Sequence, residues 1–394
     1  MSDESKPPDR PSLIERLSYP PSEKHEADRQ SVVLLLSRRT VARAVQLAVP
    51  VMPYATALGV TFAQLRRHKL ARVGAMMVAL IAMVGLFAEL LAGERPLLCK
   101  YDNHIYLLPA LSKKAAPFQS IAEYEAKRAP SDWAVFPLVQ HAPETEDLTA
   151  TFLPPLQRGH LLGTDGQGRD VFARLVFGAR TAFTAGFMGM LAFAVIGVAL
   201  GALAGFLGGI VDAFVTRLIE VLSAVPALVL VLVVQALLPQ ASTYTLVIAI
   251  VLTRWTEVAR LVRVEVHKVI SQDYVLAARA IGLTEWRILR RHVLPNAIAP
   301  AIVAGTFGIA TIVLIESSLG FLRVGLPKDT ASWGEMLSQG RLRFDAWWLM
   351  AFPGLCVFLT VASLNLVGEA LRDALDPRLR DAAASHEREP KPSR

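Results

Sequence analysis

Runs of apolar residues long enough to cross a bilayer are the feature of this chain that most constrains its fold. A membrane-spanning helix needs about 20 consecutive, mostly apolar residues. Six candidate runs are present, at 73–91, 182–207, 219–238, from 244 onward, 299–321 and 347–367. Because backbone polar groups must be paired inside a lipid core, such runs become helices. The sequence therefore predicts an all-α polytopic membrane protein with about six transmembrane helices.

The composition and the placement of charge favour the same fold class. Of 394 residues, 53% are hydrophobic and 19% are charged, whereas a soluble domain carries about a quarter charged residues. The net charge of +7 could suggest nucleic-acid binding, but the cations flank the spans. Before the first span stand Arg66, Arg67, Lys69 and Arg72. These residues place the start of that span, and with six spans both termini, in the cytosol.

The spans divide the chain into five parts. Residues 1–61 form a cytosolic extension, disordered over its first 31 residues and without a signal-peptide core. Its second half is expected to lie at the membrane surface, a seventh span being the alternative. A collar and first span (62–92), an extracytoplasmic insert (93–181), the membrane core (182–370) and a cytosolic tail (371–394) follow.

The membrane core carries two backbone signals. Glycines recur at every fourth position, and this allows a neighbouring helix to approach closely; they are Gly197, Gly201, Gly205 and Gly209. Pro226 predicts a kink in the third span. The fourth span is expected to continue into water as a helix, since Arg254, Glu257 and Arg260 follow its apolar part.

The segment 160–181, HLLGTDGQGRDVFARLVFGART, closes the insert. Gly163 and Gly168 predict a tight loop around Thr164, and Asp165, Arg169 and Asp170 can pair across it. We interpret it as a rigid outer elbow against which a partner subunit or a binding protein rests; a surface turn without a partner is the alternative. The Gly-Lys-Ser/Thr ending of a phosphate loop is found nowhere in the chain.

The cytosolic segment 274–296, YVLAARAIGLTEWRILRRHVLPN, is basic and lies between spans. Ala277 and Ala278 predict a short helix with little side-chain bulk, which Gly282 can end in a left-handed cap. Thr284 can cap a second helix over 285–293, and Leu294–Pro295 is expected to stop it. Such a segment suits a knob that docks into a cleft of a partner, an ordinary amphipathic loop helix being the alternative.

This pattern resembles the coupling loop of binding-protein-dependent ABC importer permeases, although Leu276 stands where that family usually has glutamate. The stretches 62–85, 160–181 and 353–380 are similar to the second permease of dipeptide and oligopeptide importers. The resemblance thus covers about 62–380. The insert, with LLCKYDNHIYLLPAL at 97–111, resembles the branch that imports longer or modified peptides, including microcin-type conjugates.

The resemblance implies a type I ABC importer permease in the cell inner membrane, without a catalytic site, cofactor or metal of its own. Its partners would be a homologous second permease, two cytosolic ATPases and an extracytoplasmic binding protein, with the third to fifth spans lining the pathway. The coupling loop would span 263–297, and its residues would be Leu276, Ala277, Ala278, Gly282, Leu283, Arg287, Arg290, Arg291, Leu294 and Pro295.

Several alternatives stay open. Permeases for nickel or glycosides share this type. Glu89, Glu220 and Glu316 could serve a proton-coupled transporter, but they are expected near span ends, where water reaches them. A receptor or scaffold would not need the segment 274–296. Enzyme signatures such as His-Glu-x-x-His, Gly-x-Ser-x-Gly and paired-cysteine metal spacing are missing from the sequence.

Overall fold

The computed structural model describes residues 69–111, 118, 120–238, 242–324, 327 and 329–375. The predictions for the extension 1–61, and those for the tail beyond residue 375, lie outside these residues. The elements, in chain order, are α5 Lys69–Leu86, α6 Ala88–Leu91, β1 Leu98–Tyr101, β2 His104–Leu107, η1 Pro109–Leu111, α7 Ile121–Lys127, β3 Ala134–Val135, α8 Val171–Leu207, α9 Gly209–Ser223, α10 Ala227–Leu237, α11 Thr243–Ile270, α12 Asp273–Ala280, α13 Glu285–Ile288, η2 Leu289–Val293, α14 Leu294–Ala297, α15 Ala299–Phe321, α16 Trp333–Leu342 and α17 Trp348–Leu375.

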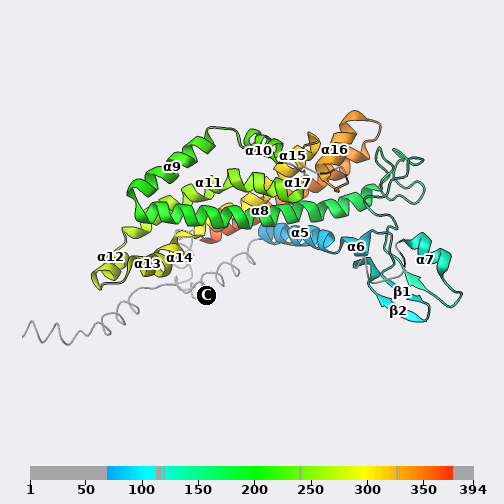
Figure 1. The fold of residues 1–394 in the computed structure, drawn as a ribbon, viewed down its shortest axis with the longest axis horizontal. Coiled ribbons are helices and arrows are strands. Elements are labelled where there is room, and N and C mark those ends of the chain that lie inside the picture. The colour runs from blue at the N-terminus through cyan, green and yellow to red at the C-terminus, as the bar shows by residue number, and fades with distance from the viewer. Residues whose placement is uncertain are drawn as a thin grey trace, which may run out of the picture.

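Two long helices, α8 and α11, run side by side along the long axis of the molecule (Figure 1). With 37 residues, α8 is about 55 Å long at a rise of about 1.5 Å per residue. The short helices α12 to α14 lie at one end of this axis, and β1, β2 and α7 lie at the other (Figure 1). These two ends, which the sequence predicts to lie on opposite sides of the membrane, are thereby joined by continuous helices.

The predicted spans are recovered in part. Four of the described helices are long and apolar enough to cross a membrane: α5, α8, α15 and α17. The break expected at Pro226 in the third span is present, but it is a 92° bend between two helices, α9 and α10, which pass the same test only as a pair. Pro226 lacks an amide N–H and takes an extended ψ of 129° before α10. The fourth predicted span is one unbroken helix, α11, through its charged residues, as expected.

The second span begins earlier than its apolar run. It was expected from residue 182, but α8 starts at Val171, because the Asp170 carboxylate accepts a hydrogen bond from the Ala173 amide at 2.8 Å. The last part of the segment 160–181 therefore belongs to this same helix. The first span is shorter than expected, with α5 ending at Leu86 and α6 following as a separate turn.

Three of the four spaced glycines bring α8 against α11. A Cβ on Gly197 would lie 2.8 Å from the Trp255 carbonyl oxygen, and one on Gly201 would lie 2.9 Å from the Ala259 Cα atom. Gly205 approaches the next turn of α11 in the same way. The prediction for Gly209 is wrong: it begins α9 with φ +53°, and a Cβ there would meet no atom within 4 Å.

The first and last spans are in contact. A Cβ on Gly74 of α5 would lie 2.9 Å from the Ser363 carbonyl oxygen and from Leu366 Cβ of α17. A Cβ on Gly85 would lie 2.7 Å from the Arg180 amide nitrogen of α8. The first and last spans, which are far apart in the sequence, thus lie next to each other and close the helical bundle.

The insert contains a small antiparallel sheet of order β2-β1-β3. Cys99 of β1 is paired with Tyr106 of β2 and Ala134 of β3. Below the sheet, Cys99, Phe118 and Tyr124 form a separate buried cluster, and the Tyr124 hydroxyl donates to the Lys100 carbonyl at 3.0 Å. The described part of the insert is thus folded around aromatic side chains.

Candidate functional site

The turn between α12 and α13 has the backbone that its glycine predicted. Gly282 has φ +81°. The Gly282 amide donates to the Arg279 carbonyl at 2.9 Å, and the Leu283 amide donates to the Ala278 carbonyl at 3.2 Å. These two bonds make a Schellman motif, the helix ending that favours glycine at this position. A Cβ on Gly282 would meet no atom within 4 Å. A side chain at this position would therefore strain the backbone and change the exposed surface, but it would not clash with a neighbour.

Ion pairing and packing hold the turn on the bundle. The Arg279 guanidinium donates two hydrogen bonds, each 3.1 Å long, to the Glu285 carboxylate across the turn. The buried face of the segment joins the main core of the protein through Val275, Ala278, Ile288, Leu289, Val293 and Ala297. The segment therefore forms a firm protrusion fixed to α11 and its neighbours.

Two details of the predicted second helix are wrong. Thr284 precedes α13, but its side chain makes no capping hydrogen bond. Leu294–Pro295 does not end the helix, because α13 continues through the π-helical turn η2 into α14, which ends at Ala297. Pro295 directly follows the π turn, and the wider hydrogen-bond spacing of that turn accommodates a residue without an amide donor.

The predicted coupling residues divide by exposure. Leu276, Gly282, Arg287, Arg290 and Arg291 are exposed; Ala277, Leu283, Leu294 and Pro295 are half-buried; Ala278 is buried. Trp286, whose exposed fraction is 66%, was not among the coupling residues predicted from the sequence. A tryptophan at this exposure on a helix end is a signal for a binding surface. Burial lowers the pKa of the neighbouring His292, and the Arg291 charge lowers it further.

The predicted elbow is a tight loop whose buried side chains form a clamp within the protein. The Asp165 carboxylate accepts hydrogen bonds from the Gln167 amide at 2.9 Å, the Arg169 amide at 3.0 Å and the Arg169 Nε at 2.7 Å. Gly163 and Gly168 have φ +82° and +72°. The side chains of Thr164, Asp165, Arg169 and Asp170 are all buried. Asp170 does not join the Asp165–Arg169 pair, since it caps α8 and contacts His160.

This clamp fastens α16 and α17 to the start of α8. Arg169 and Arg174 both bind the Glu335 carboxylate of α16, at 3.2 and 2.9 Å. The Trp348 Nε1 of α17 donates to the Thr164 carbonyl at 3.0 Å. Burial lowers the pKa of the Arg169 guanidinium, but Asp165 and Glu335 outweigh that effect, and the pKa stays raised. The residues of the predicted elbow thus help to hold α8, α16 and α17 together.

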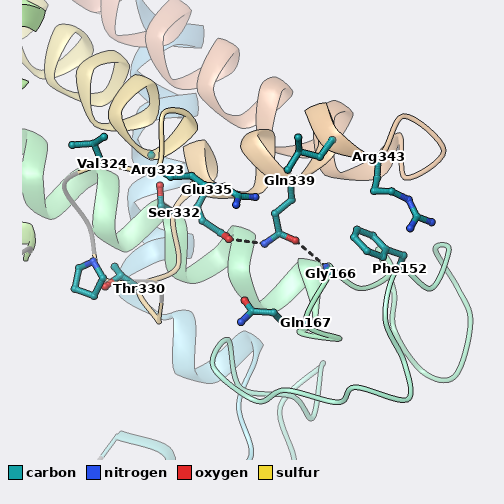
Figure 2. A pocket seen from close by; sticks show the side chains of 13 residues that line it. Phe152, Gly166, Gln167, Arg323, Val324, Thr330, Ser332, Glu335, Gln339 and Arg343 are labelled. Atoms are coloured by element: carbon teal, nitrogen blue, oxygen red, sulfur yellow. Dashed lines mark hydrogen bonds between the residues drawn. The ribbon is translucent and has the colours of Figure 1, made fainter.

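A cavity of about 350 Å³ opens beside the clamp. Figure 2 shows Gln339 at its wall, accepting from the Gly166 amide at 2.8 Å and donating to Glu335. Its lining also includes Phe152, Gln167, Gly320, Arg323, Val324, Pro327, Thr330, Ser332, Leu342 and Arg343.

Glu316 lies behind the cavity wall and corrects one expectation. It was expected near a span end within reach of water, but it is 1% exposed. Its carboxylate accepts from the Ser332 hydroxyl at 2.7 Å and the Ser317 hydroxyl at 3.2 Å. Of the other two acids, Glu89 is paired with Arg180, and Glu220 is an exposed partner of Arg217. Glu316 therefore joins α15 to α16 from inside the protein.

Comparison with known proteins gives consistent results. Residues 197–381 match the model of a family described as the inner membrane component of binding-protein-dependent transport systems. A dipeptide transport system permease of Bacillus subtilis is 38% identical over 62% of this chain and 76% of its own length. The chain belongs to the family of binding-protein-dependent transport permeases.

Two further relatives are also named as peptide transport permeases. An oligopeptide transport system permease of Bacillus subtilis is 37% identical over 57% of this chain and 74% of its own length. A di/tripeptide transport system permease of Pseudomonas aeruginosa is 39% identical over 58% and 75%. A solved structure of the inward-facing MetNI methionine ABC transporter aligns with a TM-score of 0.44 and 19% identity, over 52% of this chain and 96% of that one; the family assignment does not depend on it.

Proposed function

We propose that this permease moves peptides across the cytoplasmic (inner) membrane as one of two permease subunits of an ABC importer. The observation that carries the proposal is the 37–39% identity to permeases named for dipeptide, di/tripeptide and oligopeptide transport. The proposed partners are a homologous second permease, two cytosolic ATPases and an extracytoplasmic binding protein that delivers the peptide. The chain itself supplies no catalytic group and works by alternating access.

The protrusion formed by α12 to α14 is the proposed contact with an ATPase. It presents the apolar side chains of Leu276 and Trp286 beside three exposed arginines, Arg287, Arg290 and Arg291. Exposed tryptophan and arginine are the residue types that most often anchor a protein interface. The Schellman turn at Gly282 gives this surface one defined shape, which reduces the entropy lost on docking.

Movement at this protrusion can reach the opposite end of the molecule. The buried face of the protrusion packs in the same core as α11, and α11 is in tight contact with α8 along Gly197, Gly201 and Gly205. At its far end, α8 is joined to α16 by the ion pairs of Arg169 and Arg174 with Glu335. Rigid helices with close contacts transmit displacement without needing a flexible path.

Reconstitution tests this function. The permease, its partner permease and both ATPases would be placed in liposomes with the binding protein. We expect uptake of radiolabelled di- and oligopeptides that requires ATP, and hydrolysis that peptide-loaded binding protein stimulates. Uptake that follows an imposed proton gradient without ATP would support the proton-coupled alternative. Transport of nickel or a glycoside, with peptides inert, would leave the importer in place and overturn its proposed substrate.

A further inference from the structure

Three side chains from distant positions converge where the insert joins the membrane bundle. They are His141 from the chain segment after β3, His160 from the loop before α8, and Asp170 at the N-cap of α8. Each offers one ligand atom, and these atoms all lie within 4.8 Å of one another. Sequence spacing does not reveal this cluster, because its members belong to three separate segments.

His160 and Asp170 are held in place from several sides. The His160 Nδ1 atom lies 2.8 Å from the Asp170 Oδ2 atom. The other oxygen, Oδ1, accepts the Ala173 amide at 2.8 Å and thereby fixes the carboxylate on α8. The His160 backbone is bonded in both directions, donating to the Gln157 carbonyl at 2.9 Å and accepting from the Leu156 amide at 2.9 Å. Both side chains are almost fully buried, so they are held close to each other before any ligand binds.

His141 completes the cluster from the solvent side. Its ring centroid lies 4.4 Å from that of His160, and among the described residues its ring makes no hydrogen bond. It is half-buried, so an ion can reach it from outside.

We propose that His141, His160 and Asp170 form a binding site for one divalent transition-metal ion of the zinc type. Two imidazoles and one carboxylate are the donor set that zinc favours, with a fourth position left for water. The ion takes the place of the hydrogen bond between His160 Nδ1 and Asp170 Oδ2. Ligands of a tetrahedral site lie about 3.4 Å apart at bond lengths near 2.1 Å. The site therefore forms when the His160 and Asp170 ligand atoms, now 2.8 Å apart, separate to about 3.4 Å and His141, the least buried of the three, rotates toward them.

The position of the site defines what the ion does. Near His141, the Val139 amide donates to the Leu91 carbonyl and the Gly93 amide donates to the Val139 carbonyl, both at 3.0 Å. The segment that carries His141 is therefore bonded to the end of α6, at the base of the insert. Binding of the ion ties this base to the first turn of α8, and so fixes the insert relative to the membrane bundle.

Metal binding to the full chain, purified with its partner subunits and without an affinity tag, tests the proposal. We expect one Zn²⁺ per chain by calorimetry, and tetrahedral Co²⁺ absorption bands that Zn²⁺ abolishes. His141→Ala removes a ligand from a half-buried position, and Asp170→Asn keeps the helix cap while removing the carboxylate. Each should weaken Zn²⁺ binding at least about 10-fold.

His104→Ala is the matched control, because His104 is an exposed histidine of β2 outside the cluster; its affinity should equal that of the unmodified protein. Equal Zn²⁺ affinity in the unmodified protein and in His141→Ala, or the absence of stoichiometric binding to the unmodified protein, would overturn the proposal. Transport assays do not enter this test, so it stands apart from the proposed function.

Discussion

Substitutions of Gly282 distinguish the effect of backbone strain from the effect of a new side chain on docking at the proposed ATPase contact. The residue has φ +81°, and a Cβ would meet no atom within 4 Å. A left-handed backbone costs a non-glycine residue roughly 1–2 kcal/mol, while asparagine adopts this region more readily than most residues. Because no clash is added, a side chain here acts only through that strain and through what it presents at the surface.

Three variants therefore give three expected results. Gly282→Ala loses about 1 kcal/mol of local stability and keeps most of its uptake. Gly282→Asn is milder still. Gly282→Asp has nearly the size of asparagine but carries a charge into the proposed contact, where leaving a charge unpaired costs about 2–5 kcal/mol. At about 1.4 kcal/mol per factor of ten, ATPase affinity should fall at least about 30-fold, and uptake should be lost.

The measurement is ATPase affinity by pull-down titration, with uptake in the same membranes and expression matched by immunoblot. Gly282→Asn controls for size and backbone geometry. If Gly282→Asp assembles and transports like the unmodified protein at equal expression, the segment is not the coupling element. If asparagine is as damaging as aspartate, the reasoning about charge is wrong and strain dominates.

Three further predictions concern the coupling segment, the contact between α8 and α11, and the orientation of the chain in the membrane. Leu276→Glu, at a position 50% exposed, restores the acid that the resembled coupling loops usually carry, so it should change stability by less than about 0.5 kcal/mol and leave uptake intact; loss of ATPase binding would contradict this. Gly201→Leu should separate α8 from α11 and lower the thermal midpoint measured in detergent, whereas Gly354→Ala, whose Cβ would only touch a side-chain carbon at 3.8 Å, should not. Cysteines placed at Ser120 and Thr284 should react with an impermeant thiol reagent from opposite sides of the membrane, and labelling from the same side would refute the topology.

The features predicted well from sequence are those set by local chemistry. The α15 helix covers 299–321 as the apolar run predicted, because length and hydropathy alone determine such a span. The Gly282 turn follows from one residue that takes positive φ cheaply. Gly197, Gly201 and Gly205 contact a neighbouring helix because their four-residue spacing places them on one face.

The features that were missed depend on contacts between distant segments. Asp165, Arg169 and Glu335 look like surface charges in the sequence, and only the meeting of α8 with α16 buries them as one network. The buried position of Glu316 depends likewise on Ser332, from the segment that follows α15. The strands of the insert have four residues or fewer, too short for a period of two to be recognised.

The contact between α5 and α17 has a consequence for biosynthesis. The Gly74 face of α5 leaves the ribosome long before its partner surface at Ser363 and Leu366, which lies about 290 residues later in the chain. At synthesis rates of about 5–20 residues per second, α5 waits in the membrane for roughly tens of seconds. During that delay its small-residue face can be covered only by lipid or by the insertion machinery. The contact between α5 and α17 therefore forms only after α17 has been made, and a truncation before α17 should leave α5 accessible to insertases and membrane proteases.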